Sequence, residues 1–132
     1  MSTARHKIIK VGIMPIDQFK KRSIAIANGQ YKPKRNEPRI WFRSMKSLAH
    51  VLSEENQALL RVIVETKPQS IKELEDITGR KANNLLRTLR SMENYGFVKL
   101  KEGKGSRGRS PLIPEVIYDS AEIDINFFGS TV

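Results

Sequence analysis

The chain has 132 residues, of which 39% are hydrophobic, which predicts one compact domain with a modest core and an appended arm. It contains no cysteine, and this excludes disulfides, cysteine-ligated zinc and cysteine nucleophiles. No apolar run reaches the roughly 18 residues needed to cross a bilayer, and no signal-peptide core follows the basic N-terminus. We therefore expect a cytoplasmic protein with no membrane partner.

The formal net charge of +10 is concentrated in two zones of the sequence. Residues 1–43 hold eleven Lys and Arg against two acids, and residues 80–109 hold nine against two. Residues 44–79 carry a net −2, and residues 110–132 hold four acids and no Lys or Arg. Such segregation indicates a polyanionic partner, with nucleic acid favoured first and an anionic membrane surface second.

The first 39 residues predict a basic arm made of a strand, a helix and a linker. Apolar residues alternate with others over 9–14, which is typical of a short strand. A helix is predicted over 15–28, ended by Gly29, and the Pro-containing, charged segment 30–39 is interpreted as a linker. The inward residues of this helix are expected at helical spacing: Ile16, Phe19, Ser23 and Ile26.

Residues 40–118 are predicted to form the compact domain. Ser44 can cap a first helix, and Ser53 can cap a second one, which is apolar over much of its circumference and should be the central buried helix. This second helix must end before Pro68. Ser70, followed by Glu three residues later, forms a capping-box pattern that opens a short helix, which Gly79 ends.

A fourth helix follows Gly79 and ends at Gly96. At 100° per residue, its apolar side chains fall within an arc of roughly 120°. These residues are Ala82, Leu85, Leu86, Leu89 and Met92. Arg87 lies near the middle of the opposite face, where no acid occurs before Glu93. Leu86 tilts toward the edge of the core, where it can pack or touch a thymine methyl group.

After Gly96 the pattern changes to that of a β-hairpin with a basic tip. Segments 97–101 and 111–118 have strand character, and the glycine-rich segment between them carries Lys104, Arg107 and Arg109. The two arginines can insert into a narrow minor groove or make phosphate contacts only. Residues 119–132 are predicted as an acidic C-terminal tail. The predicted fold class is thus α+β, mostly helical, with the order helix-helix-helix-helix-hairpin.

The residue types on the fourth helix are suited to reading DNA. Arg can bond to guanine O6 and N7, and Asn can bond to adenine N6 and N7, in the major groove. The candidate base-contacting residues are Ala82, Asn83, Asn84 and Arg87. The candidate backbone-contacting residues are Arg80, Lys81, Arg90, Ser70, Lys104, Arg107 and Arg109. The simpler alternative is that this polar face is only solvated.

The stretch "SIKELEDITGRKANNLLRTLRSMENYGFVKLKEG" resembles the winged helix-turn-helix of MarR-type regulators. The shared features are a capped helix, a glycine, a recognition helix and a characteristic close, which here consists of Leu89, Met92, Gly96, Phe97 and Val98. Over about residues 40–125 the chain is also similar to a group of small antitoxin-like regulators of the TumA type.

This resemblance implies a winged helix-turn-helix fold and a role in DNA binding. Arg80, Asn84 and Arg87 fall where the antitoxin-like group tends to carry Arg, Asn and Arg. The sequence departs from the group at Lys81, Leu86 and Thr88, which affects the expected operator sequence more than the fold.

Together these patterns predict a sequence-specific regulator that binds a double-stranded DNA operator as a homodimer. We expect a repressor or antitoxin of a toxin–antitoxin module that binds its own promoter. The alternatives are an antitoxin that acts mainly by binding a toxin protein directly, and an RNA-binding winged-helix protein. No catalytic motif is legible, and His6 and His50 lack neighbours at metal-ligand spacing, so we expect neither an enzyme nor a cofactor.

Overall fold

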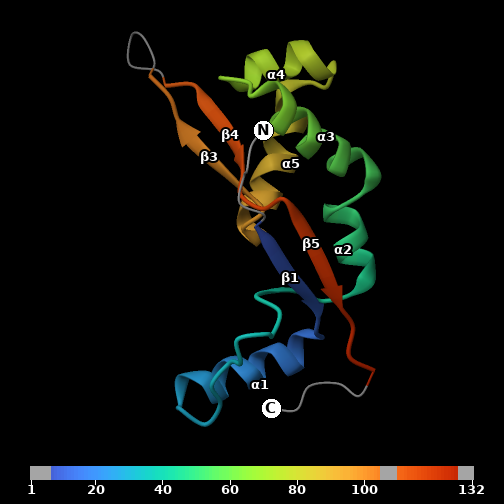
Figure 1. The fold of residues 1–132 in the computed structure, drawn as a ribbon, viewed down its shortest axis with the longest axis vertical. Coiled ribbons are helices and arrows are strands. Elements are labelled where there is room, and N and C mark those ends of the chain that lie inside the picture. The colour runs from blue at the N-terminus through green and yellow to red at the C-terminus, as the bar shows by residue number, and fades with distance from the viewer. Residues whose placement is uncertain (1–6, 105–109, 128–132) are drawn as a thin grey trace. The chain divides into compact units, whose positions relative to one another are not determined.

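The computed structural model describes residues 7–104 and 110–127, and over these residues it has five helices and five strands (Figure 1). The fold class is α+β, as predicted, although roughly half of the chain is helical where the sequence predicted a mostly helical fold. None of the described helices is long and apolar enough to cross a membrane.

The chain divides into two compact units, one formed by residues 1–50 with 120–132 and the other by residues 51–119. Helix α2 (Met45–Val51) ends at the division between them. The described elements of the first unit are β1 (Ile8–Ile13), α1 (Ile16–Ala27), β2 (Ile40–Phe42) and β5 (Ser120–Asp124). The second unit contains α3 (Glu54–Thr66), α4 (Ile71–Thr78), α5 (Ala82–Tyr95), β3 (Val98–Glu102) and β4 (Leu112–Val116).

A three-stranded parallel sheet forms the centre of the first unit, in the order β2-β1-β5. Strand β1 was predicted, and its alternating residues Ile9 and Val11 are buried. Strands β2 and β5 were not predicted: residues 40–42 were taken as the start of the compact domain, and residues 119–132 as a tail. The first of these strands has only three residues, and every residue of β5 is exposed, so neither carries an apolar alternation.

Helix α1 has the predicted extent but a different buried face. It ends at Ala27, and Gly29 follows with φ 75°, in agreement with its predicted role. The predicted inward residues Ile16 and Ser23 are exposed, whereas Arg22 and Ala25 are buried. The helical spacing was therefore read on the wrong face, because a buried arginine cannot be foreseen from an apolar pattern.

Gly12 in β1 allows a close approach of the Trp41 ring from β2. A Cβ atom at position 12 would lie 2.8 Å from Cε3 of Trp41 and 2.9 Å from Cγ of Pro38, which is closer than carbon atoms pack. The two residues are register partners in the parallel pair of strands. Gly12 is therefore required for space at this position.

Helix α3 begins and ends as the sequence predicted. Oγ of Ser53 accepts a hydrogen bond from the backbone N of Asn56 at 3.2 Å, and Lys67 ends the helix with φ 48° just before Pro68. The helix is nevertheless buried on one side only, through Leu59 and Ile63. It packs against α4 and β4, so the prediction that it is the central buried helix was wrong.

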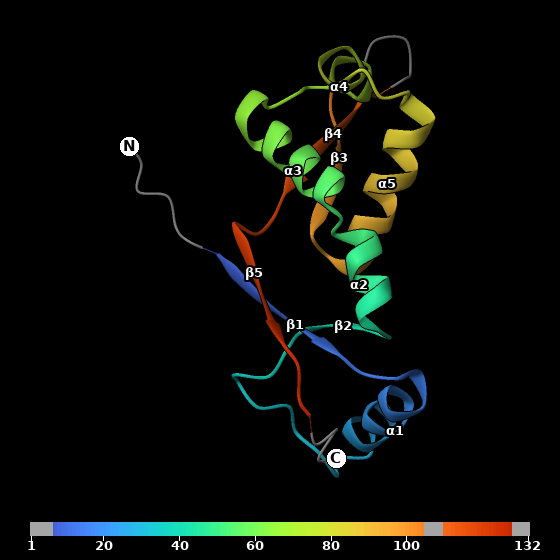
Figure 2. The ribbon, with the colours of Figure 1, turned by 90° about the vertical axis from the view of Figure 1, so that its right-hand side faces the viewer.

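The second unit combines α3, α4 and α5 with the antiparallel hairpin of β3 and β4 (Figure 2). Helix α5 packs against α4 and β3, while α3 packs against β4. The order of these elements agrees with the prediction. The apolar residues buried in this unit include Leu59, Ile63, Ile71, Leu74, Leu85, Leu89, Met92, Phe97 and Val98.

We expect Gly12→Ala to lower the free energy of unfolding by about 1–3 kcal/mol, because the added methyl group overpacks the site below Trp41. Urea denaturation followed by far-UV circular dichroism measures the change. The same substitution in a Trp41→Leu background should cost less, since the ring that it meets is gone. An equal cost in both backgrounds would show that contact with Trp41 is not the cause.

Candidate functional site

Helix α5 has two faces of opposite character. Leu85, Leu89 and Met92 are fully buried, which confirms the predicted core-facing stripe. On the other side the charged and amide side chains are exposed, and these are Asn83, Asn84, Arg87 and Arg90. The structure gives Arg87 and Arg90 no acidic partner within residues 7–104 and 110–127. Their positive charge is therefore available to an anionic partner.

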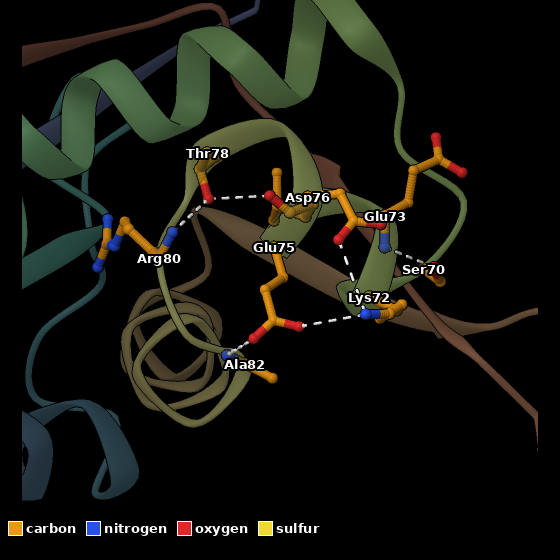
Figure 3. Close-up of polar contacts among 9 residues, drawn as sticks. Ser70, Lys72, Glu73, Glu75, Asp76, Thr78, Arg80 and Ala82 are labelled. Atoms are coloured by element: carbon orange, nitrogen blue, oxygen red, sulfur yellow. Dashed lines mark hydrogen bonds and ion pairs between the residues drawn. The ribbon is translucent and has the colours of Figure 1, made fainter.

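The connection from α4 to α5 is held by hydrogen bonds from its own residues (Figure 3). Gly79 adopts a left-handed conformation with φ 78°, which favours glycine. The backbone N of Arg80 donates to Oγ1 of Thr78 at 3.1 Å, and this hydroxyl donates to the carbonyl of Leu74 at 2.8 Å. The direction in which α5 leaves the turn is thus determined locally.

A carboxylate of α4 occupies the start of α5. Oε2 of Glu75 accepts a hydrogen bond from the backbone N of Ala82 at 3.0 Å (Figure 3). This acid replaces a side-chain cap, because Lys81 at the N-cap position makes no capping bond. A negative charge here stabilises the helix through its dipole and also competes with a phosphate for the same N–H groups.

The side chain of Arg80 lies along α5. Its Nε donates to Oδ1 of Asn84 at 2.8 Å, and its Nη2 donates to Oγ1 of Thr88 at 3.0 Å. The sequence suggested Arg80 as a backbone-contacting residue, but in this structure two of its nitrogens are bound to α5 itself. The four-residue spacing of positions 80, 84 and 88 is the sequence signal for this arrangement.

The remaining predicted residues lie in three places. Ala82 and Leu86 are half-buried at the edge of the stripe. Oγ of Ser70 accepts the backbone N–H of Glu73 at 3.0 Å, so this hydroxyl caps α4 and keeps its own hydrogen for another acceptor. Lys104 is exposed just after β3. The two predicted arginines of the hairpin tip, Arg107 and Arg109, lie outside the described residues.

The hairpin is closed next to its tip. The backbone N of Gly103 donates to the carbonyl of Pro111 at 2.8 Å, and Nζ of Lys101 lies 2.9 Å from Oε1 of Glu115. Glu93, the acid at the end of α5, is half-buried and accepts the backbone N–H of Leu100 at 3.0 Å. This acid therefore faces the hairpin.

Comparison with known families places the second unit within a larger match. Residues 51–123 match the HVO_A0114 family, which is more than half of the chain. The chain belongs to the HVO_A0114 family. No curated protein and no solved structure matches the sequence significantly. Membership of HVO_A0114 assigns a family and not an activity, so the function is argued from the geometry.

Outside the HVO_A0114 match lies a polar cluster in the first unit, centred on Arg22. Only 8% of this residue is exposed, and its Nη2 lies 3.0 Å from Oε1 of Glu37. The guanidinium also lies 5.2 Å from the ring centroid of Trp41 and 5.8 Å from that of Tyr31. Paired with a carboxylate and stacked on two rings, the arginine can be buried.

Glu37 accepts three hydrogen bonds within this cluster. The donors are Nη2 of Arg22, the hydroxyl of Tyr31, and the backbone N of Lys34 at 2.7 Å. Burial raises the pKa of Glu37, but these hydrogen bonds and the charge of Arg22 outweigh it and leave the pKa below its ordinary value. The bond to Glu37, followed by burial, raises the pKa of Tyr31. Segment 30–39, predicted as a linker, is therefore tied to α1 by side-chain bonds.

A pocket of about 440 Å³ adjoins this cluster and is built without residues of the second unit. Besides the cluster, its lining includes the apolar side chains of Met14, Pro38, Ile125 and Phe127. Within residues 7–104 and 110–127, no group of His, Asp or Glu side chains is placed to hold a metal ion.

We expect Glu75→Gln to lower the free energy of unfolding by about 0.3–1 kcal/mol, because the charge at the start of α5 is lost. Thermal unfolding followed by circular dichroism measures the change. Asp76→Asn is the matched control, since both acids pair with Lys72 but only Glu75 reaches Ala82. An equal loss in both variants would contradict the capping role.

The contribution of Glu37 should depend on pH. Its pKa is lower in the folded chain, so the stabilisation is complete above the ordinary value of 4.5 and is lost as the pH falls through the folded pKa. Wild type should therefore exceed Glu37→Gln by about 1–2 kcal/mol at pH 7, and this difference should shrink below pH 4.5. Urea denaturation between pH 7 and pH 3 tests this.

Asp17→Asn is the control for that series, since it removes an exposed carboxylate of α1 with the same change of charge. A difference between wild type and Glu37→Gln that stays constant across this pH range would contradict the assigned bonds.

Proposed function

We propose that the chain is a sequence-specific regulator that binds double-stranded DNA, acting as a repressor and antitoxin of a toxin–antitoxin module at its own promoter. In this proposal α3, α4, α5 and the hairpin of β3 and β4 form a MarR-like winged helix-turn-helix, with α5 as its recognition helix. The observation that carries the proposal is the exposed face of α5, where Asn83, Asn84, Arg87 and Arg90 lie without an acid among them.

The chemistry of this face is suited to a major groove. Asn83, Asn84 and Arg87 carry groups that bond to base edges, with Ala82 beside them for an apolar contact. Lys81 and Arg90 are exposed and can contact phosphates from the same helix. Ser70 can donate its hydroxyl hydrogen to a phosphate, and Lys104 extends the cationic surface onto the hairpin.

A homodimer is part of the proposal. One recognition helix covers a single half-site, and high specific affinity usually requires two half-sites with centres about 34–36 Å apart. The operator should therefore be a pseudo-palindrome. A monomer that binds a single half-site with full affinity would exclude this arrangement.

Selection of binding sites from random DNA duplexes, followed by footprinting upstream of the chain's own gene, tests the proposal. We expect one pseudo-palindromic sequence to be enriched and protected. Competition with duplex RNA separates the RNA-binding alternative, which the burial of Phe42 and Phe97 does not favour because RNA-binding modules usually expose aromatic rings. If no sequence is enriched, the proposal fails.

A second candidate function is direct binding of a protein, such as a cognate toxin. The observation that favours it is β5, an edge strand with no buried residue, where Ile123 is 52% exposed. Ile125 and Phe127 follow it and are 48% and 91% exposed. Exposed apolar side chains beside an edge strand are typical of a protein contact, and this function is compatible with DNA binding.

We expect Arg87→Ala and Lys104→Ala to weaken DNA binding in different ways. Loss of Arg87 should cost about 1–3 kcal/mol on the selected operator and relax the preference at one base pair. Loss of Lys104 should weaken binding to all duplexes and reduce the slope of log K against log salt by about one. Titrations of operator and random duplexes at several salt concentrations measure both effects.

Each of these variants is the control of the other, since both remove one exposed positive charge. The base-reading role of Arg87 is contradicted if Arg87→Ala reduces binding to operator and random duplexes equally.

A further inference from the structure

The bond between Arg80 and Asn84 determines which end of the Asn84 amide faces outward. Nε of Arg80 lies 2.8 Å from the amide, and Nη2 lies 3.0 Å from Oγ1 of Thr88, so the guanidinium is held at two points on α5. The backbone N of Arg80 is held as well, by Thr78. The arginine therefore has a defined position before any partner binds.

A guanidinium has donors and no acceptor. The atom of Asn84 that faces Nε must therefore be its carbonyl oxygen, Oδ1, and the amide nitrogen Nδ2 must point away. Exchange of the two ends would place N–H groups against N–H groups. Asn84 is exposed, so its outward end is open to a partner, and this end offers two donors and no acceptor.

An asparagine without such a neighbour bonds to adenine with both ends, donating to N7 and accepting from N6. Asn84 cannot do this while Arg80 holds its oxygen, and the N6 hydrogens of adenine would face the hydrogens of Nδ2. Guanine presents two neighbouring acceptors, O6 and N7, at the same edge. A donor-only side chain therefore matches guanine and is mismatched with adenine.

We infer that Asn84 selects guanine over adenine, and that Arg80 is the positioning residue that sets this preference. The inference rests on the proposed function, since it assigns a base to one residue of the proposed recognition helix. It differs from the sequence-based expectation, in which Arg80 contacts the DNA backbone and asparagine favours adenine. Thr88 is the second anchor of the same guanidinium and contributes to the preference indirectly.

The inference is tested by site selection with wild type, Asn84→Ala, Arg80→Met and Thr88→Val. The position that loses its preference in Asn84→Ala is the one that Asn84 reads. Wild type should carry guanine there, and Arg80→Met should shift the ratio of guanine to adenine toward adenine by about fivefold or more, the lower end of discrimination by one base contact. Thr88→Val should shift the ratio in the same direction by less.

Two results would overturn the inference while the proposed function stands. Wild type could enrich an operator with adenine at the position read by Asn84. Arg80→Met could instead weaken binding to all duplexes and reduce the salt slope with no change of base, which would make Arg80 a phosphate contact. Enrichment of no sequence by wild type would overturn both the inference and the proposed function.

The contact itself can be measured in the free protein, without DNA. Exchange of the Arg80 Nε hydrogen with water, followed by ¹⁵N NMR, should be slow in wild type and several-fold faster in Asn84→Leu, which removes the acceptor. Asn83→Leu is the matched control, because it removes a neighbouring exposed amide to which the structure assigns no bond with Arg80. Equal exchange in wild type and Asn84→Leu would show that Asn84 is not oriented by Arg80.

Discussion

The burial of one stripe of α5 determines which of its side chains reach solvent. Leu85, Leu89 and Met92 are completely enclosed, so rotation of the helix by even one residue would expose apolar surface and bury charge. The outward direction of Asn84 and Arg87 is a consequence of this packing. Any function carried by the exposed face therefore depends on the core of the second unit as much as on the exposed residues.

Acidic side chains are placed so that they do not reach the exposed face of α5. Glu93 belongs to this helix but accepts the backbone N–H of Leu100 and so faces the hairpin. Glu75 belongs to α4 and accepts the first N–H of α5. Both acids satisfy backbone donors, and the cationic character of the exposed face is retained. The sequence shows an acid-poor helix, whereas the structure shows where the nearest acids are used.

Local signals predicted most of the second unit. The caps at Ser53 and Ser70, the glycine after α4 and the change of period after Gly96 each act over a few residues, and each is found in the structure. Strands β2 and β5 were missed because the bonds that form them come from β1, which is remote in the sequence. The buried face of α1 was wrong because Glu37, the partner of Arg22, lies 15 residues away in a segment that resembles a linker. At the candidate site, residue types were predicted, but the use of Arg80 by Asn84 and Thr88 required the rotamers.

The position of Trp41 has a spectroscopic consequence. It is the single tryptophan of the chain, and it lies in the first unit between Gly12 and the guanidinium of Arg22. Its emission reports the surroundings of that unit alone, whereas most of the helical ellipticity arises from α3, α4 and α5 in the other unit. The natural chain thus carries separate optical signals for its two units, and whether they unfold together can be followed without an added label.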